Sequence, residues 1–257
     1  MKGWIRCAAV GVLSAGLLHA CASGGNEEPR PLTVLFDEGH GQHFMADGKA
    51  PLDLSRLAAQ FESQGYRVAT GAQEMSDTIL SGTDVLVISG PFKPFTVAEN
   101  DAVLRFLTRG GRLSVMLHIA QPVTSLLEQL GVVTSNGVIR ERENVIDVDP
   151  MNFRVTKLAQ HELTANLDNF EMFGVWALLA SGRKTTVVAQ TSPTAWVDLN
   201  QNKQLEPGDA VQSFAVAVAG QFGAGRFVVF GDDALFQNEF LKANNEALSV
   251  NLARWLK

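Results

Sequence analysis

Residues 84–89 read Asp84-Val-Leu-Val-Ile-Ser89, a run of four consecutive apolar residues of which three are β-branched. β-branched side chains favour extended strands. A strand without polar alternation is typical of a parallel sheet that is covered on both faces. The covering layers of such a sheet are helices, so this run predicts an α/β fold.

The segments around this run alternate between strand-like and helix-like patterns. Thr96-Val-Ala-Glu99 has the residue types of a capping box, and the helix that it opens ends at Gly110-Gly111. Further strands are expected at 32–36, 66–69, 112–118 and 226–230, and further helices at 52–65, 122–130 and 233–256. Alternation of this kind predicts βαβ units and a mostly parallel sheet with helices on both faces.

The stretch from about 132 to 220 interrupts this alternation. It holds short β-like pieces at 145–148, 153–155, 186–188, 195–197 and 213–218. No linker-like composition separates it from its surroundings. We therefore expect a β-rich extension of the same sheet and a single domain over residues 32–257.

The N-terminus has the pattern of an export signal. Lys2 and Arg6 are followed by an apolar run from Cys7 to Leu18, which is shorter than the roughly 20 residues that span a bilayer. Leu18-His19-Ala20-Cys21 resembles the bacterial lipobox. The resemblance implies cleavage after Ala20 and lipid on Cys21, with residues 1–20 as signal peptide; the alternative is an ordinary secretory signal without lipid.

Residues 21–31 are small, polar and proline-flanked, which is typical of a flexible tether. With a lipid on Cys21 they would hold the domain on a membrane of a bacterial cell envelope. Ala22 after the lipidated cysteine is compatible with the periplasmic face of an outer membrane. The membrane is thus the first expected partner.

Charge and cysteine content narrow the function further. The net charge is −6, and removal of Lys2 and Arg6 with the signal makes it −8. An acidic chain without a basic run does not suggest nucleic-acid binding. Cys7 and Cys21 are the two cysteines of the sequence, so after Cys21 the mature chain has no thiol for a disulfide, a metal site or nucleophilic catalysis.

Several short motifs carry a resemblance to a known family. They are Asp37-Glu-Gly-His-Gly-Gln-His-Phe44, Ser89-Gly-Pro91, Phe95-Thr-x-x-Glu99, Gly110-Gly111, His161-Glu-Leu-Thr164, Gly231-Asp-Asp, Asn238, Asn245 and Asn251-Leu-Ala-Arg-Trp255. Together they resemble the uncharacterised domain of the glutamine-amidotransferase-like superfamily, which occurs in gliding-motility and transport auxiliary proteins and in an intraflagellar-transport subunit.

The resemblance spans residues 32–257. It implies a flavodoxin-like three-layer α/β/α sandwich, usually without demonstrated enzymatic activity. Amidotransferases of this superfamily carry a nucleophilic cysteine at a strand-to-helix elbow. The corresponding stretch here is Met116-Leu-His-Ile-Ala-Gln121, which offers no cysteine, serine or threonine. The cysteine mechanism is therefore excluded.

In an open parallel sheet, ligands bind beyond the carboxyl ends of the strands. The polar residues expected there are Asp37, Glu38, His40, His43, Ser89, His118, Asp232, Asp233 and Asn238.

Asp37-x-x-His40-x-x-His43 is the densest titratable cluster in the sequence. It could bind a ligand or a metal or carry out acid–base chemistry, or it could simply hydrogen-bond its own glycine-rich loop. Asp232 and Asp233 could face the crevice or cap the closing helix. Asn238 could tie that helix to the facing loop.

Residues 198–209 form a second candidate site. Asp198, Asn200, Asn202 and Asp209 stand at positions 1, 3, 5 and 12 of an EF-hand-type calcium loop. Lys203 stands where such loops have glycine, and the last ligand is Asp instead of Glu. The alternative is a polar turn between strands, so calcium is the only cofactor that the sequence suggests.

These observations favour a membrane-tethered, non-catalytic module that binds a small molecule, a glycan or an envelope protein. One alternative is a hydrolase that uses the Asp37–His43 cluster together with Asp232 or Asp233. A further alternative is a scaffold subunit of a transporter-associated assembly.

Overall fold

The apolar run at 84–89 forms β3 (Val85–Ser89), and all five of its residues are buried. In the computed structural model, which describes Met1, residues 30–200 and residues 202–257, this strand lies inside a sheet of twelve strands. The parallel part of the sheet has the order β2 (Arg67–Gly71), β1 (Thr33–Asp37), β3, β4 (Arg112–Met116) and β15 (Gly225–Phe230). The predicted buried parallel strand is confirmed.

The sheet continues beyond β15 with antiparallel strands. β14 (Ala215–Phe222) pairs with β15 along its length. The remaining strands are β10 (Trp176–Ala180), β5 (Val132–Arg140), β12 (Trp196–Val197), β13 (Ala210–Val211), β11 (Thr185–Gln190) and β8 (Lys157–Leu158). The fold is thus a mixed α/β fold whose sheet is only partly parallel and rich in strands.

Part of the stretch 132–220 departs from the expectation. β6 (Val145–Ile146), β7 (Asp149–Val155) and β9 (Phe170–Phe173) form a separate three-stranded antiparallel sheet. The prediction that this stretch only extends the main sheet was wrong for these strands. Phe153, Phe170 and Met172 are buried in the same core as the closing helix, so burial of its own apolar face holds this small sheet in place.

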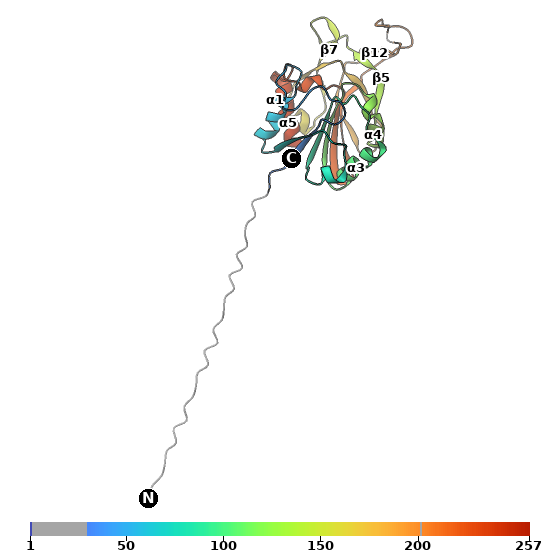
Figure 1. Ribbon diagram of the computed structural model, residues 1–257. Helices are drawn as coiled ribbons and strands as arrows, with labels where there is room; N and C mark the ends of the chain where they lie inside the picture. Colours follow the sequence, from blue (N-terminus) through green and yellow to red (C-terminus); the bar gives the residue numbers. More distant parts are fainter. Residues whose placement is uncertain (2–29, 201) are drawn as a thin grey trace. The chain divides into compact units, whose positions relative to one another are not determined.

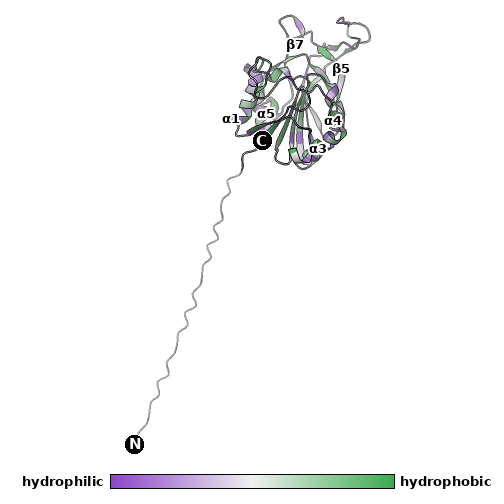
Figure 2. Cartoon of the chain, in the orientation of Figure 1, coloured by the Kyte–Doolittle hydropathy of each residue, from purple (hydrophilic) through white to green (hydrophobic). Residues whose placement is uncertain are grey.

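Helices lie on both faces of the sheet (Figure 1). α1 (Ser55–Ser63) and α5 (Ala243–Trp255) share one core with Val34 and Val85. α2 (Asp77–Leu80), α3 (Val97–Thr108) and α4 (Thr124–Gln129) share the other core with Leu86 and Ile88. Successive residues of β3 therefore alternate between two cores, as a central strand must. Figure 2 shows the hydrophobic residues concentrated in the strands between the helices.

The predicted capping box opens α3. The Thr96 hydroxyl accepts a hydrogen bond from the Glu99 backbone N–H, and the Glu99 carboxylate accepts one from the Thr96 backbone N–H. Both bonds satisfy amides that a helix start leaves without intrahelical partners.

The closing helix is shorter than predicted. A helix from residue 233 to 256 was expected, but Ala234–Phe236 forms a single 3₁₀ turn (η3) and α5 begins only at Ala243. Between them the backbone N–H of Asn238 donates to the Asp53 carbonyl and that of Glu239 donates to the Pro51 carbonyl. These long-range bonds replace the local i→i−4 bonds of a helix.

Residues 31–257 form one unit of the chain. Cys21, the predicted signal peptide and the tether up to residue 29 lie outside the described residues. Within the part that the structure describes, no helix is both long enough and apolar enough to cross a membrane.

Asn245 fastens α5 to the rest of the domain. Its side chain is buried, accepts a hydrogen bond from the Glu171 backbone N–H and donates to the carbonyls of Glu171 and Leu235. We expect Asn245→Ala to lower the free energy of unfolding by about 2–4 kcal/mol, because it leaves buried backbone groups without partners. Urea denaturation measures this change.

Asn244→Ala is the matched control, since Asn244 lies next to it on α5 and is only half-buried. Its expected cost is below about 0.5 kcal/mol. Equal effects of the two substitutions would contradict this role of Asn245.

Candidate functional site

The carboxyl ends of β1, β3, β4 and β15 meet at one edge of the sheet. The loops that follow these strands bring together residues that are distant in the sequence. His118 follows β4, Ser89 ends β3, and Asp232 and Asp233 follow β15. The sequence-based expectation that these four residues converge through the fold agrees with this arrangement.

His118 and Asp233 form the central pair of this edge. His118 Nδ1 lies 3.1 Å from Asp233 Oδ1. The Asp233 side chain is 2% exposed, whereas that of His118 is 41% exposed, so the carboxylate is buried beneath an imidazole that solvent can reach. This hydrogen bond to Asp233 raises the pKa of His118, and burial opposes it. The pair therefore favours a protonated imidazole.

Gly90 leaves the space that the contact between His118 and Asp233 needs. A Cβ atom at Gly90 would lie 2.5 Å from Asp233 Oδ2 and 3.3 Å from His118 Cβ, and the residue has a φ of +52°. A side chain at this position would displace the carboxylate. Asp233 Oδ2 and Ser89 Oγ are both buried without a hydrogen-bond partner among the described residues. Buried polar atoms of this kind are uncommon in proteins and often mark functional sites.

Asp232 is the second buried carboxyl group. It accepts hydrogen bonds from the backbone N–H groups of Phe173 and Ala234. Burial, together with the neighbouring Asp233, raises the pKa of Asp232 to about 8. At neutral pH this group is thus largely protonated and can donate a hydrogen bond.

Neither aspartate caps α5, so the alternative that at least one of them caps the closing helix is wrong. Asp232 accepts the Ala234 N–H at the start of a 3₁₀ turn, not of α5. Asp233 makes no side-chain cap bond and turns toward His118 instead. The N-cap residue of α5 is Lys242.

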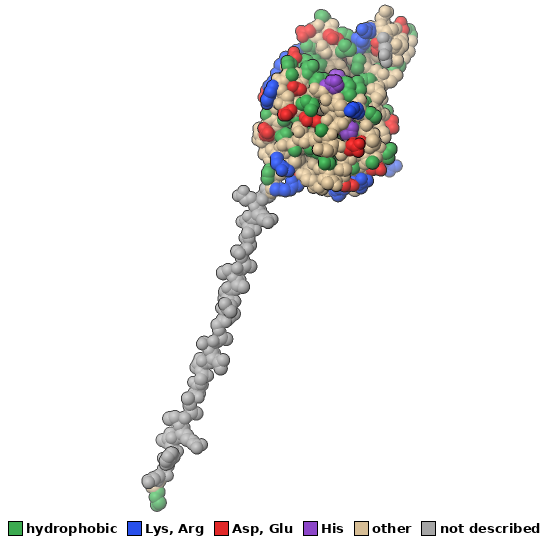
Figure 3. All heavy atoms as spheres, viewed as in Figure 1, with side chains coloured by type: hydrophobic (Ala, Val, Ile, Leu, Met, Phe, Trp, Pro, Cys, Tyr) green, Lys and Arg blue, Asp and Glu red, His purple; other side chains and the backbone are tan. Residues whose placement is uncertain are grey.

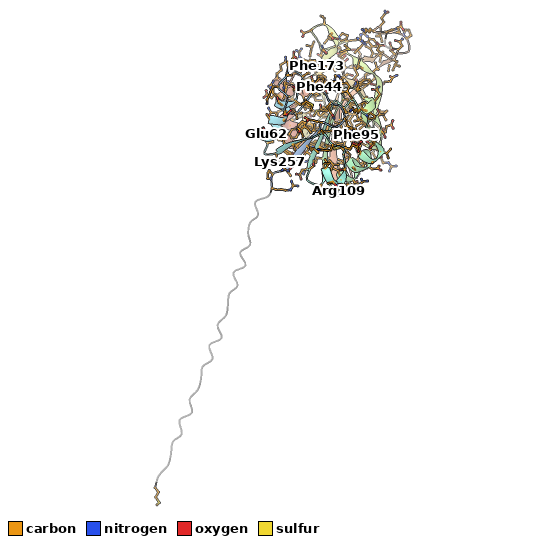
Figure 4. All side chains as sticks on the ribbon, viewed as in Figure 1. Phe44, Glu62, Phe95, Arg109, Phe173 and Lys257 are labelled. Carbon is orange, nitrogen blue, oxygen red and sulfur yellow. The ribbon has the colours of Figure 1, made fainter. Side chains whose placement is uncertain are left out.

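A cavity of about 320 Å³ opens beside the pair. This volume lies at the lower end of the range for small-ligand pockets. Its polar lining is His118, Asp232, Asp233, Asn152 and Gln237, and its apolar lining includes Phe44, Leu52, Leu117, Met151, Phe173 and Phe240. Phe173 and Phe240 contact each other with ring centroids 4.2 Å apart. Figure 4 shows Phe44 and Phe173 toward the same end of the domain.

The Asp37–His43 cluster does not line this cavity. His40 is buried, and its ring lies between two carboxylates: Nδ1 is 2.8 Å from Asp37 Oδ2 and Nε2 is 2.9 Å from Glu99 Oε1. Burial lowers the pKa of His40, but the two acids outweigh it and raise the pKa overall. His40 also stacks on Phe95, with ring centroids 3.6 Å apart. Both ring nitrogens are occupied, so His40 has no nitrogen free for a ligand.

The other members of the cluster also have local partners. Glu38 accepts the Ala46 backbone N–H, and burial raises the pKa of Glu38. His43 is exposed, and its ring lies 4.5 Å from that of Phe92. Phe92 in turn lies 5.2 Å from the His118 ring. Through Phe92, the cluster is thus in contact with His118 without lining the cavity.

Asn238 contacts the loop before α1. Its side-chain oxygen accepts the Arg56 backbone N–H, and its amide donates to the Ala50 carbonyl. It thus ties the segment before α5 to the facing loop, and it does not line the cavity.

The candidate calcium loop connects β12 and β13. Asp198 accepts the backbone N–H groups of Asn202 and Lys203, and Asp209 accepts those of Leu199 and Glu206. In the described residues, which omit position 201, no group of three or more His, Cys, Asp or Glu could hold a metal. Calcium binding stays a prediction, and it would have to replace these hydrogen bonds.

Sequence reasoning missed several residues of the site. The sequence identified Glu99 as a helix cap. It did not reveal the hydrogen bond between Glu99 and His40, because the two residues are 59 positions apart in the chain. Phe44, Phe173 and Phe240 come from three separate loops or strand ends, and no local pattern marks them. The only sequence signal near them is the pair of aspartates that follows Gly231.

Fold and site together define a mixed α/β domain with a small, partly aromatic cavity at the carboxyl edge of its parallel strands. The chain belongs to the family described as a domain of unknown function (DUF4350), whose model matches residues 47–253. No curated protein matches the chain.

Solved structures share the fold. The mmIFT52 N-terminal domain has a TM-score of 0.70 at 18% identity, with 87% of this chain and 96% of that chain covered. A ThuA-like protein from Bacteroides uniformis has a TM-score of 0.53 at 16% identity, with 91% and 94% covered. The cytoplasmic protein STM1381 from Salmonella typhimurium has a TM-score of 0.54 at 13% identity, with 88% and 100% covered. At such identities the likeness shows the fold and not the function.

The His118–Asp233 pair can be tested by titration. We expect His118 to titrate at a higher pH than an ordinary histidine, and Asp233→Asn to lower its pKa, because the substitution removes the negative acceptor. A folded-state pKa above the unfolded value adds stability at low pH that is lost as the pH rises through the folded value.

NMR titration of the imidazole signals measures both values, and His161, whose pKa burial lowers, is the internal control. An unchanged His118 pKa in the Asp233→Asn variant would contradict the pairing.

Proposed function

We propose that this protein is a lipid-anchored envelope protein whose domain binds a small hydroxyl-bearing molecule, such as a sugar, in the cavity beside His118 and Asp233. The observation that carries the proposal is that one cavity is lined by His118, Asp232 and Asp233 together with Phe44, Phe173 and Phe240. The domain would hold this ligand without transforming it.

The strand order supports a site at this place. We propose that the parallel part, β2-β1-β3-β4-β15, is a flavodoxin-like core with helices on both faces. In this order the connections change direction between β1 and β3, and ligands of such folds bind at the carboxyl ends around that point. The β1 and β3 loops supply Phe44 and Gly90 to the site.

The lining favours a ligand with both polar and apolar faces. The protonated Asp232 donates a hydrogen bond, His118 donates one in its protonated form, and the Asp233 carboxylate accepts one. Phenylalanine faces beside such groups can pack against the C–H face of a sugar ring. A strongly anionic ligand would meet the negative charge of Asp233, which makes a neutral ligand the more suitable occupant.

A hydrolase is the alternative with an observation in its favour. Asp233 orients His118 through Nδ1, the arrangement that positions a histidine as a general base. The version of this alternative that relies on His40 has weak support, because Asp37 and Glu99 occupy both nitrogens of that ring. A hydrolase would therefore depend on His118.

Binding and turnover can be separated on the purified full chain. We expect one class of sugar to raise the thermal unfolding temperature, and Phe173→Ala or His118→Ala to weaken binding by about tenfold or more, since each removes a main wall or donor. Phe222→Ala is the matched control, because Phe222 is a half-buried phenylalanine outside this cavity.

The absence of a response to any sugar would oppose the proposed ligand class. If the wild-type chain released a hydrolysis product and the His118→Ala variant did not, the protein would be a hydrolase and not a binding protein.

The membrane anchor is a separate part of the proposal. It rests on Leu18-His19-Ala20-Cys21 and the tether-like composition of residues 21–31. We expect cells grown with radiolabelled palmitate to label the wild-type chain and not the Cys21→Ala variant, since the thiol is the lipid acceptor. Cys7→Ala is the control and should still be labelled. Equal labelling of the wild type and the Cys21→Ala variant would contradict the proposal that Cys21 carries the lipid.

A further inference from the structure

A second cavity lies at the opposite end of the sheet. It has a volume of about 420 Å³ and is bounded by the start of β11, the end of β14, the start of β15 and the end of α5. These are the amino ends of the parallel strands, whereas the candidate site lies at their carboxyl ends. The two cavities share no lining residue.

The lining of this second cavity is basic. Arg183, Lys184 and Arg226 line it together with His161, and Glu162 is its single acidic residue. Among the residues that the structure describes, none of these three cations has a salt-bridge partner. This cluster occurs in a chain whose net charge is −6, so the basic character is local and does not follow from overall composition.

Arg226 is held in place more firmly than a surface arginine. Its guanidinium lies 5.1 Å from the centroid of the Trp255 ring. Arg112 stands directly beside it in the register of β4 and β15. Burial, followed by the proximity of Arg112, lowers the pKa of Arg226. Glu162, which also lines the cavity, opposes this shift, and a bound anion would add to its attraction for Arg226.

We propose that this cavity binds a phosphate-bearing group, with Arg226 as the fixed donor and Arg183 and Lys184 as flexible donors at its rim. Guanidinium groups match phosphate oxygens through paired N–H donors, and a lysine ammonium adds a point charge. Thr186 and Gln221 also line the cavity and supply neutral hydrogen-bond donors, whereas the Thr185 hydroxyl donates to the Gly182 carbonyl.

The phosphate has two sources to distinguish, a free phosphate or a phospholipid headgroup. The described domain starts at Pro31, and β1 begins at Thr33 on the same end of the sheet as this cavity. β15 lies three strands from β1, which is about 14 Å. A tether over residues 21–31 reaches at most about 40 Å when extended.

If the proposed anchor on Cys21 holds, headgroup phosphates come within reach of this end. Figure 3 shows lysine and arginine side chains along the lower edge of the domain, where Figure 4 labels Arg109 and Lys257.

The test uses the full chain in non-ionic detergent, which contains no phosphate. Inorganic phosphate and glycerophosphoglycerol, a phosphodiester with the shape of a lipid headgroup, are titrated separately against sodium chloride of equal ionic strength. Thermal unfolding and ³¹P NMR line width report binding. We expect at least one of the two probes to bind and Arg226→Gln to weaken it by about tenfold or more.

If the Arg226→Gln variant does not fold, Arg183→Gln and Lys184→Gln provide the same test. Both residues are exposed, so we expect these variants to fold and to bind the probe more weakly. Arg254→Gln is the matched control, since Arg254 bonds to Gln64 and does not line the cavity. Tight binding of the diester assigns the site to lipid headgroups, and binding of inorganic phosphate alone assigns it to free phosphate.

A response no larger than that to chloride, or equal effects of Arg254→Gln and the rim variants, would overturn the phosphate site. The phosphate site does not depend on the other two proposals. It would still hold if the wild-type chain took up no palmitate, or if no sugar bound beside His118.

Discussion

The buried ion triad of Asp37, His40 and Glu99 is the interaction on which the candidate site depends. The ring of His40 joins the end of β1 to the start of α3, and its backbone carbonyl accepts the N–H groups of Phe92 and Lys93. Phe92 then packs against His118. Breaking a buried pair of this kind is costly, because one charge is left uncompensated. The triad thus holds the loop after β3, which carries Gly90 and places the Phe92 ring beside His118.

The two ends of the sheet have opposite chemical character. The carboxyl end carries buried acids beside phenylalanine rings. The amino end carries two arginines and a lysine that have no salt-bridge partner within the described part of the chain. A tethered domain with this polarity would turn its basic end toward an anionic membrane and its acidic cavity away from it, because the chain enters the domain at the basic end. The two proposed sites are therefore compatible in one protein.

Family membership and shared fold set limits to function without deciding it. Solved structures with this fold bear names as different as mmIFT52 and ThuA-like, and function resides in sites carried by folds. The features that bear on function here are side-chain arrangements: the His118–Asp233 pair, the raised pKa of Asp232 and the Arg226–Trp255 contact. A likeness of fold alone establishes none of these roles.

The sequence by itself determined the features that depend on near neighbours: the buried strand at 85–89, the capping box of Thr96 and Glu99, and the position of His118 and Asp233 at strand ends. Only the tertiary structure decided the features that depend on distant ones. The partnership of His40 with Glu99, the phenylalanine walls and the late start of α5 arise from contacts across tens to hundreds of residues. Local patterns report backbone preference and burial, whereas such contacts exist only once the core has closed.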